Sequence, residues 1–218
     1  RWARKKIEQD PRGYSFVDLG EQSYFKDIDP EKLRIVIADY KNMIKYHSNG
    51  HHQYLFSNSL LQSDVVINLP KLKTHRRTGI TLAVKNFMGL PSLKDSLPHF
   101  MTGSPLEGGD QYIYPSFRKR IGTWMHDRIQ SSRFLFAKFF FAVIKRLIWN
   151  SHHIVPFRDN ISEAMWPGND TVWRTLYDLN RAVLYADKRG IMQKTQQRGY
   201  FCLMDGIIGG EGDGPVAC

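Results

Sequence analysis

Three runs of consecutive apolar residues predict the buried strands of this chain. They are Leu33–Ala38, Val65–Leu69 and Arg198–Asp205. Continuous apolar runs, in place of strict alternation, are typical of parallel strands that are covered on both faces. Helical patterns separate the three runs, so the sequence predicts an α/β fold with a mostly parallel sheet flanked by helices.

The clearest helical pattern begins near Asn169-Asp170, where either side chain is of the type that caps a first helical turn. Apolar residues then recur at helical spacing: Val172, Leu176, Leu179, Val183 and Leu184. Asp187–Gly190 supplies a stop signal. Arg174 lies in the first turn, where it is either part of an ordinary helix start or a clamp for a carboxylate ligand.

Basic residues follow directly on the second predicted strand. Lys71, Lys73 and His75 are spaced two apart, so in an extended chain their side chains point to one side. They lie at the carboxyl end of Val65–Leu69, where open α/β sheets bind ligands. Each residue alone also suits a solvated basic loop, and His75 equally suits a structural histidine. The whole group favours a binding site for an anion.

A helix is predicted from Gly79 to Gly89, with Pro91 just beyond its end. On a helical wheel, Thr78, Thr81 and Lys85 share a face that differs from the apolar one. The amides of a helix start carry roughly half a positive charge. Together with the lysines and the histidine, they would favour a carboxylate or a phosphate.

An acidic, glycine-rich loop follows the third predicted strand. Asp205 ends the strand, and Glu211 and Asp213 follow among five glycines between positions 206 and 214. Such carboxylates suit a hard cation such as Mg²⁺, or one of them a general base. The alternative is a polar turn whose acidic side chains have no function. If this loop lies beside Lys71–Lys85, the fold joins an anion site to an acid/base or metal group, and that combination is catalytic in character.

The net charge of +10 is concentrated in one segment of the 218 residues. Between Ser116 and Asn150 there are eight lysines and arginines and one acid, Asp127. Phe134–Trp149 within it is apolar and aromatic, but at sixteen residues it is shorter than the ~20 that span a bilayer. It suits a helix lying on an anionic membrane surface, or an inserted helical hairpin packed on the domain's own core. Nucleic acid is disfavoured, because no named binding module matches.

The remaining composition sets the expected context. Residues 92–160 are predicted to be an insertion that carries the basic aromatic helix. Two cysteines, Cys202 and Cys218, form no disulfide framework, so a cytoplasmic setting is expected, extending to the inner face of the membrane. The chain begins at Arg1 and not at a methionine, so we expect a truncated form of a single domain over residues 1–218.

Three blocks resemble the DUF362 family of bacterial and archaeal proteins: Asp64–His75 with Gly79–Thr81, Lys85-Asn86 and Gly89; Gly168–Arg174 with Asp178–Asn180; and Asp205–Pro215. The family is largely uncharacterised, and many members carry ferredoxin-like iron–sulfur modules. The resemblance therefore implies redox chemistry with an external, ferredoxin-like electron donor. This chain lacks the cysteine set that an intrinsic cluster would need.

A shorter stretch is similar to the nickel-pincer lactate racemase family. His75, Gly79, Thr81 and Lys85 match the spacing of that family's histidine, glycine, hydroxyl residue and cofactor-holding lysine. The glycine pair that precedes the family's lysine is replaced here by Ala83-Val84. The similarity implies a site position and a racemase or isomerase alternative to redox chemistry.

Together these patterns predict an enzyme that binds an anionic small molecule. The candidate catalytic residues are His75, Lys85, Asp205 and Glu211. The candidate ligand-binding residues are Lys71, Lys73, Thr78, Gly79, Thr81, Asn86 and Arg174. The candidate ligands for a divalent metal are Asp205, Glu211 and Asp213, and no other cofactor is identified. The alternative is a non-catalytic module that binds a membrane surface through residues 116–150.

Overall fold

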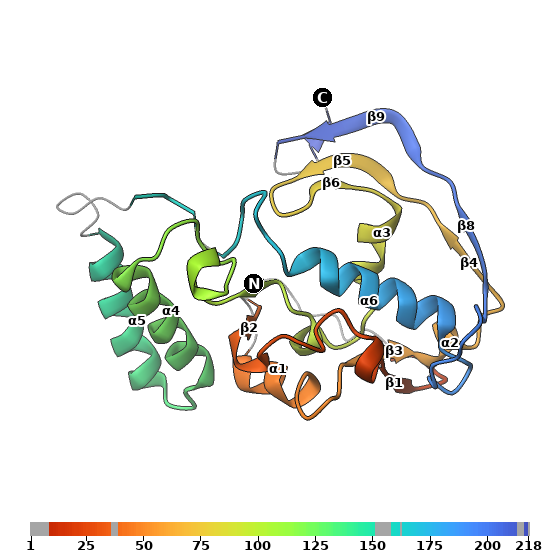
Figure 1. Cartoon of the computed structure of the whole chain (residues 1–218), viewed down its shortest axis with the longest axis horizontal. Coiled ribbons are helices and arrows are strands. Elements are labelled where there is room, and N and C mark those ends of the chain that lie inside the picture. The colour runs from red at the N-terminus through yellow and green to blue at the C-terminus, as the bar shows by residue number, and fades with distance from the viewer. Residues whose placement is uncertain (1–8, 36–38, 151–157, 162, 213–215, 218) are drawn as a thin grey trace.

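The computed structural model describes residues 9–35, 39–150, 158–161, 163–212 and 216–217 (Figure 1). Its α-helices are α1 (Tyr40–Tyr46), α2 (Asn58–Leu61), α3 (Ala83–Asn86), α4 (Phe117–Ser131), α5 (Leu135–Asn150) and α6 (Val172–Tyr185). Its strands are β1 (Tyr14–Asp18), β2 (Leu33–Arg34), β3 (Gln53–Ser57), β4 (Val65–Asn68), β5 (Lys71–His75), β6 (Gly79–Thr81), β7 (Phe100–Met101), β8 (Gly199–Cys202), β9 (Asp205–Glu211) and β10 (Val216–Ala217). Single 3₁₀ turns lie at Gly20–Gln22, Pro30–Lys32, Phe87–Gly89, Lys94–Ser96 and Pro105–Glu107.

The strands form small mixed sheets. β4 pairs with β8 and β5 with β9 in parallel. The other described pairs, β1·β3, β2·β7, β5·β6 and β9·β10, are antiparallel. The fold is therefore α/β, as the sequence predicted, but a mostly parallel sheet is not confirmed.

The apolar strands are less buried than their sequences suggested. In the pair formed by β4 and β8, Ile67 is 68 % exposed and Phe201 is 66 % exposed. These strands form a two-stranded ribbon whose other face meets the domain, through Val66 and Tyr200. Of the strand predicted at 33–38, β2 accounts for Leu33 and Arg34, and residues 36–38 lie outside the described part of the chain.

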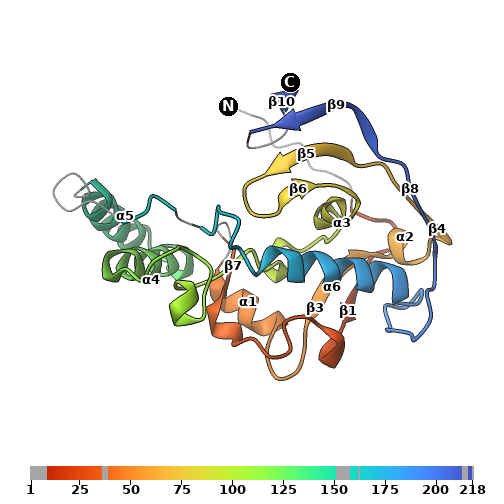
Figure 2. The ribbon, with the colours of Figure 1, turned by 45° about the horizontal axis from the view of Figure 1, so that its top comes forward.

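Helix α6 is the centre of the core. Leu179, Ala182 and Val183 are fully buried and lie in one cluster with Tyr54 and Phe56 of β3. The sequence predicted this helix correctly. Its first amides are capped by Asn169, whose Oδ1 accepts from Thr171 N (3.2 Å) and Val172 N (2.8 Å). Figures 1 and 2 show α6 between strands β1 and β3 on one side and the sheet that contains β5, β6 and β9 on the other.

The segment predicted as a helix from Gly79 begins as a strand. Gly79 has φ +69° and lies opposite His75 in a β-hairpin, and β6 then runs antiparallel to β5 as far as Thr81. The helix α3 begins only at Ala83. The prediction was wrong here, because β-branched Ile80 and Thr81 pair with a strand that a helical-spacing pattern does not reveal. Thr78, Thr81 and Lys85 therefore do not form one helical face.

The basic aromatic segment forms a helical hairpin, α4–α5, that projects from one end of the molecule (Figure 2). Arg34 anchors it through an ion pair with Asp127 (3.1 Å), and Ser131 Oγ donates to Asp39 Oδ1 (2.8 Å). Within the described chain, no helix has the length and apolar character required to cross a bilayer.

Candidate functional site

Pairing of β5 with β9 brings the predicted basic and acidic segments together. Lys71 lies opposite Asp205 in the parallel register, and their charged groups are 4.0 Å apart. Both side chains are about half exposed, so solvent screens this pair and it contributes little to stability. The basic segment and the acidic segment therefore lie side by side, as a joint site would require.

The inner face of the β5–β6 hairpin carries Lys73. Lys73 lies directly opposite Thr81, and directly opposed residues of an antiparallel pair share one face of the sheet. Thr81 is buried, so this face turns towards the domain. Thr74, the neighbour of Lys73, points to the outer side, where its hydroxyl donates to the Gly212 carbonyl (2.8 Å).

Lys73, Arg77, Lys85 and His99 gather in this region, and we call them the basic cluster. Burial, then the positive charges of Arg77 and Lys73, lower the pKa of the Lys85 ammonium below its usual value. Burial also lowers the pKa of the Arg77 guanidinium, against which the charges of Glu163 and Asp110 act. In the described residues, no ion pair joins Lys73 or Lys85 to a carboxylate.

His99 completes the cluster from the loop before β7. Its Nδ1 donates to the Leu97 carbonyl (2.8 Å), so Nε2 carries the lone pair of the neutral ring. Burial lowers the pKa of His99 to about 4, and the charges of Arg77 and Lys85 act in the same direction. At neutral pH the cluster therefore contains three cations and one uncharged imidazole.

Several predicted site residues hold the hairpin turn. His75 Nδ1 accepts from the Arg77 backbone amide (3.2 Å), and the Thr78 hydroxyl donates to the Ile80 carbonyl (3.1 Å). Gly79 supplies the left-handed backbone conformation of the turn. The Thr81 hydroxyl donates to the Lys73 carbonyl (3.3 Å), so it braces the strand that carries that lysine.

Asn86 and Arg174 also have partners within the protein. Asn86 Nδ2 donates to Asn68 Oδ1 (2.7 Å), and Asn68 in turn donates to the Ala83 carbonyl (2.8 Å) and to the Tyr200 hydroxyl (2.9 Å). This network fixes α3, and with it Lys85, against β4 and β8. The Arg174 guanidinium forms an ion pair with Asp170 (2.8 Å) and donates to the Tyr24 carbonyl (2.9 Å). These contacts of Arg174 are those of an ordinary helix start.

Two of the three predicted metal ligands lie in the described part of the chain. Asp205 and Glu211 lie at opposite ends of β9. Between them the pairing with β5 shifts register, because Lys71 lies opposite Asp205 and Lys73 opposite Gly210. Asp213 lies outside the described residues. Over the part of the chain that the structure describes, no group of three or more histidines, cysteines and carboxylates is placed to hold a metal ion.

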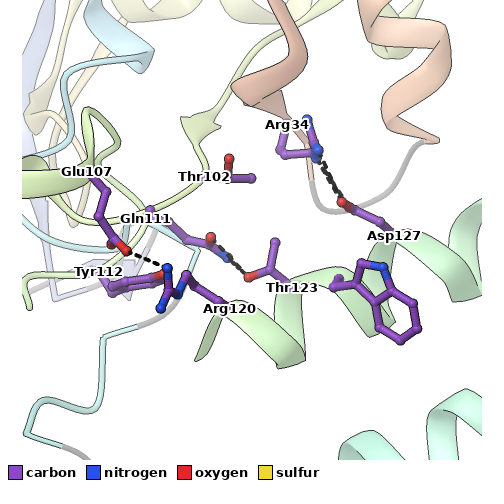
Figure 3. A pocket seen from close by; sticks show the side chains of 10 residues that line it. Arg34, Thr102, Glu107, Gln111, Tyr112, Arg120, Thr123 and Asp127 are labelled. Carbon is purple, nitrogen blue, oxygen red and sulfur yellow. Dashed lines mark hydrogen bonds and ion pairs between the residues drawn. The ribbon is translucent and has the colours of Figure 1, made fainter. Parts of the chain in front are cut away.

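A second feature, which the sequence did not indicate, is a cavity of about 400 Å³ between the loop after β7 and α4 (Figure 3). Its charged groups neutralise one another, since Arg34 pairs with Asp127 and Arg120 with Glu107 (3.5 Å). Gln111 Nε2 donates to the Thr123 hydroxyl (2.9 Å) across it. This balance of charge distinguishes the cavity from the basic cluster.

The fold and the cluster define an α/β domain with a group of cations beside its central helix. A family model described as "Domain of unknown function (DUF362)" matches residues 16–218, so the chain belongs to the DUF362 family. No curated protein and no solved structure matched it. Arg77 lies inside the motif that resembles the family, but it was not among the predicted site residues. His99 lay in a loop with no local signal of function.

Proposed function

We propose that this domain is an enzyme that binds an anionic small molecule, a carboxylate or a phosphate, at the basic cluster. The observation that carries the proposal is the environment of the Lys85 ammonium group. Its ammonium is partly buried beside two other cations, Lys73 and Arg77, and no carboxylate of the described residues pairs with it. Like charges gathered in a partly desolvated place repel one another, and a bound anion relieves that repulsion.

The same environment suits Lys85 for proton transfer or for nucleophilic attack on a carbonyl. A lysine becomes a useful base or nucleophile when burial and neighbouring cations lower its pKa towards the working pH. The neutral His99 offers a lone pair on Nε2 in the same cluster. In this proposal Lys73 and Arg77 bind the anion, and Lys85 or His99 exchanges a proton with it.

Calorimetric titration with inorganic phosphate and with pyruvate tests the binding step. The comparison is between the unchanged protein, Lys85→Met and the control Lys188→Met, which also removes one positive charge but from an exposed lysine paired with Asp64. We expect Lys85→Met to weaken binding by about tenfold or more, because it removes a charge that is partly desolvated. Lys188→Met should bind as the unchanged protein does.

A proton count gives a second readout. A bound anion stabilises the charged forms of Lys85 and His99, so it raises the pKa of both groups and the complex takes up protons. Titrations with pyruvate in two buffers of different ionisation enthalpy measure this uptake at pH 7, because pyruvate, unlike phosphate, has no group of its own that titrates near this pH. The proposal fails if neither anion binds, if Lys85→Met binds as well as Lys188→Met, or if pyruvate binding releases protons.

A further inference from the structure

The outer face of α5 is a continuous apolar stripe. It consists of Phe136, Phe139, Phe140, Val143 and Leu147, whose spacing places them on one side of a helix. Phe136 is 91 % exposed and Phe139 is 73 % exposed. An exposed apolar face of this length is typical of an interaction site and not of an ordinary surface.

The stripe is separate from the face with which α5 packs inside the hairpin. Phe141 meets Trp124 of α4 edge to face, with ring centroids 5.7 Å apart, and Ala137 and Ile144 are partly buried on the same side. The α4–α5 contact therefore uses other residues of α5, and the stripe points away from α4. Its residues are all at least 41 % exposed.

The charge around the stripe is positive. Asp127, the one acid between residues 116 and 150, is bound by Arg34 of the domain body. Five basic residues of the hairpin form no ion pair with a carboxylate in the described residues: Arg128, Arg133, Lys138, Lys145 and Arg146. The hairpin thus combines an aromatic face with basic residues that form no ion pair in the described part of the chain.

We infer that the α4–α5 hairpin binds an anionic lipid membrane surface, with the stripe inserted at the boundary between headgroups and acyl chains. Aromatic and aliphatic bulk on one face and basic residues on the polar face are what an interfacial helix requires. A second copy of this chain is a poorer partner, because two hairpins face to face would bring their basic residues together. This inference does not depend on the basic cluster.

Vesicle flotation of the full chain at low salt tests the inference. The vesicles contain either phosphatidylcholine alone or equal parts of phosphatidylcholine and phosphatidylglycerol. We expect the protein to float with the anionic vesicles, and F136S/F139S/F140S to bind them at least about tenfold more weakly. The matched control is Ile207→Ser, because Ile207 is 93 % exposed on β9, away from the hairpin. It should bind as the unchanged protein does.

A charge variant separates the two contributions. Arg133→Ser with Arg146→Ser should weaken binding to anionic vesicles by about fivefold for each charge, and the difference should shrink as salt is added. Each variant is first shown by circular dichroism to melt at the temperature of the unchanged protein.

Four results would overturn the inference. They are an absence of flotation with anionic vesicles, equal binding to both kinds of vesicle, unchanged binding by F136S/F139S/F140S, and a dimer in solution that this variant abolishes while vesicle binding persists. The last result would assign the stripe to a second copy of the chain.

Discussion

A pair of buried histidines predicts how the stability of this fold depends on pH. His47 Nε2 contacts the Ser96 carbonyl (2.9 Å), which can only accept, so Nε2 carries the proton. His47 Nδ1 is then the acceptor opposite His52 Nδ1, 3.2 Å away. A further proton on His47 would set two N–H groups against each other. Burial, the largest cause, lowers the pKa of His47 to about 4.

The sign and the size of the effect follow from linkage. The unfolded chain protonates His47 near its ordinary pKa of about 6.5, whereas the folded chain does so only near 4. Between these values the unfolded state binds more protons, so stability is complete above pH 6.5 and falls as the pH falls. From pH 7 to 4.5 the loss due to this residue is about 2 kcal/mol.

The perturbation is His47→Gln, compared with the unchanged protein by urea unfolding at steps between pH 7 and 4.5. The variant starts less stable, but we expect it to lose about 2 kcal/mol less across this range. Leu97→Ala is the control, because it also removes a buried side chain of the same core and has no titratable group. If all three proteins lose the same stability between pH 7 and 4.5, His47 is not the group whose protonation destabilises the fold.

Two further substitutions test contacts that position the site. Asp110→Ala should destabilise the fold by about 3 kcal/mol or more in urea unfolding at pH 7. The reason is that the buried Asp110 carboxylate accepts hydrogen bonds from the backbone amides of Met101, Asp170 and Thr171. A loss of stability below about 1 kcal/mol would contradict this account. Arg198→Ala should cost about 2–4 kcal/mol in the same assay, because its guanidinium binds carbonyls at the end of α6. If Arg198→Ala leaves the stability unchanged, water molecules replace the guanidinium as hydrogen-bond donors to these carbonyls.

The parts of the fold that were predicted correctly carry their signal locally. Helix α6 has a capping asparagine, a helical spacing of apolar residues and a stop sequence, all within one stretch. The strand at Val65 is an apolar run that ends at Pro70. These features depend on neighbours in the sequence, so a sequence pattern is sufficient to find them.

One part that was missed depends on contacts between distant residues. His99 is held in place by its own amide, which donates to the Arg34 carbonyl (2.8 Å), and by its carbonyl, which accepts from Asn169 Nδ2 (2.9 Å). Neither partner is near it in the sequence. The strand at Gly79–Thr81 was missed for a different reason, because its partner β5 is only a few residues away but the helical spacing of Gly79–Gly89 does not show the hairpin between them.

The parallel pairing of β4 with β8 also has a consequence for how the molecule forms. Val65 lies opposite Gly199, so the two partners are 199 − 65 = 134 residues apart. Contacts across so long a loop form slowly, since the chain must lose much of its freedom before they are made. During synthesis, Lys71 leaves the ribosome long before its neighbour Asp205. We therefore expect the pairs β4–β8 and β5–β9 to form after α6, and a nascent chain stalled before residue 199 would hold the lysines without the strand β9 that lies beside them.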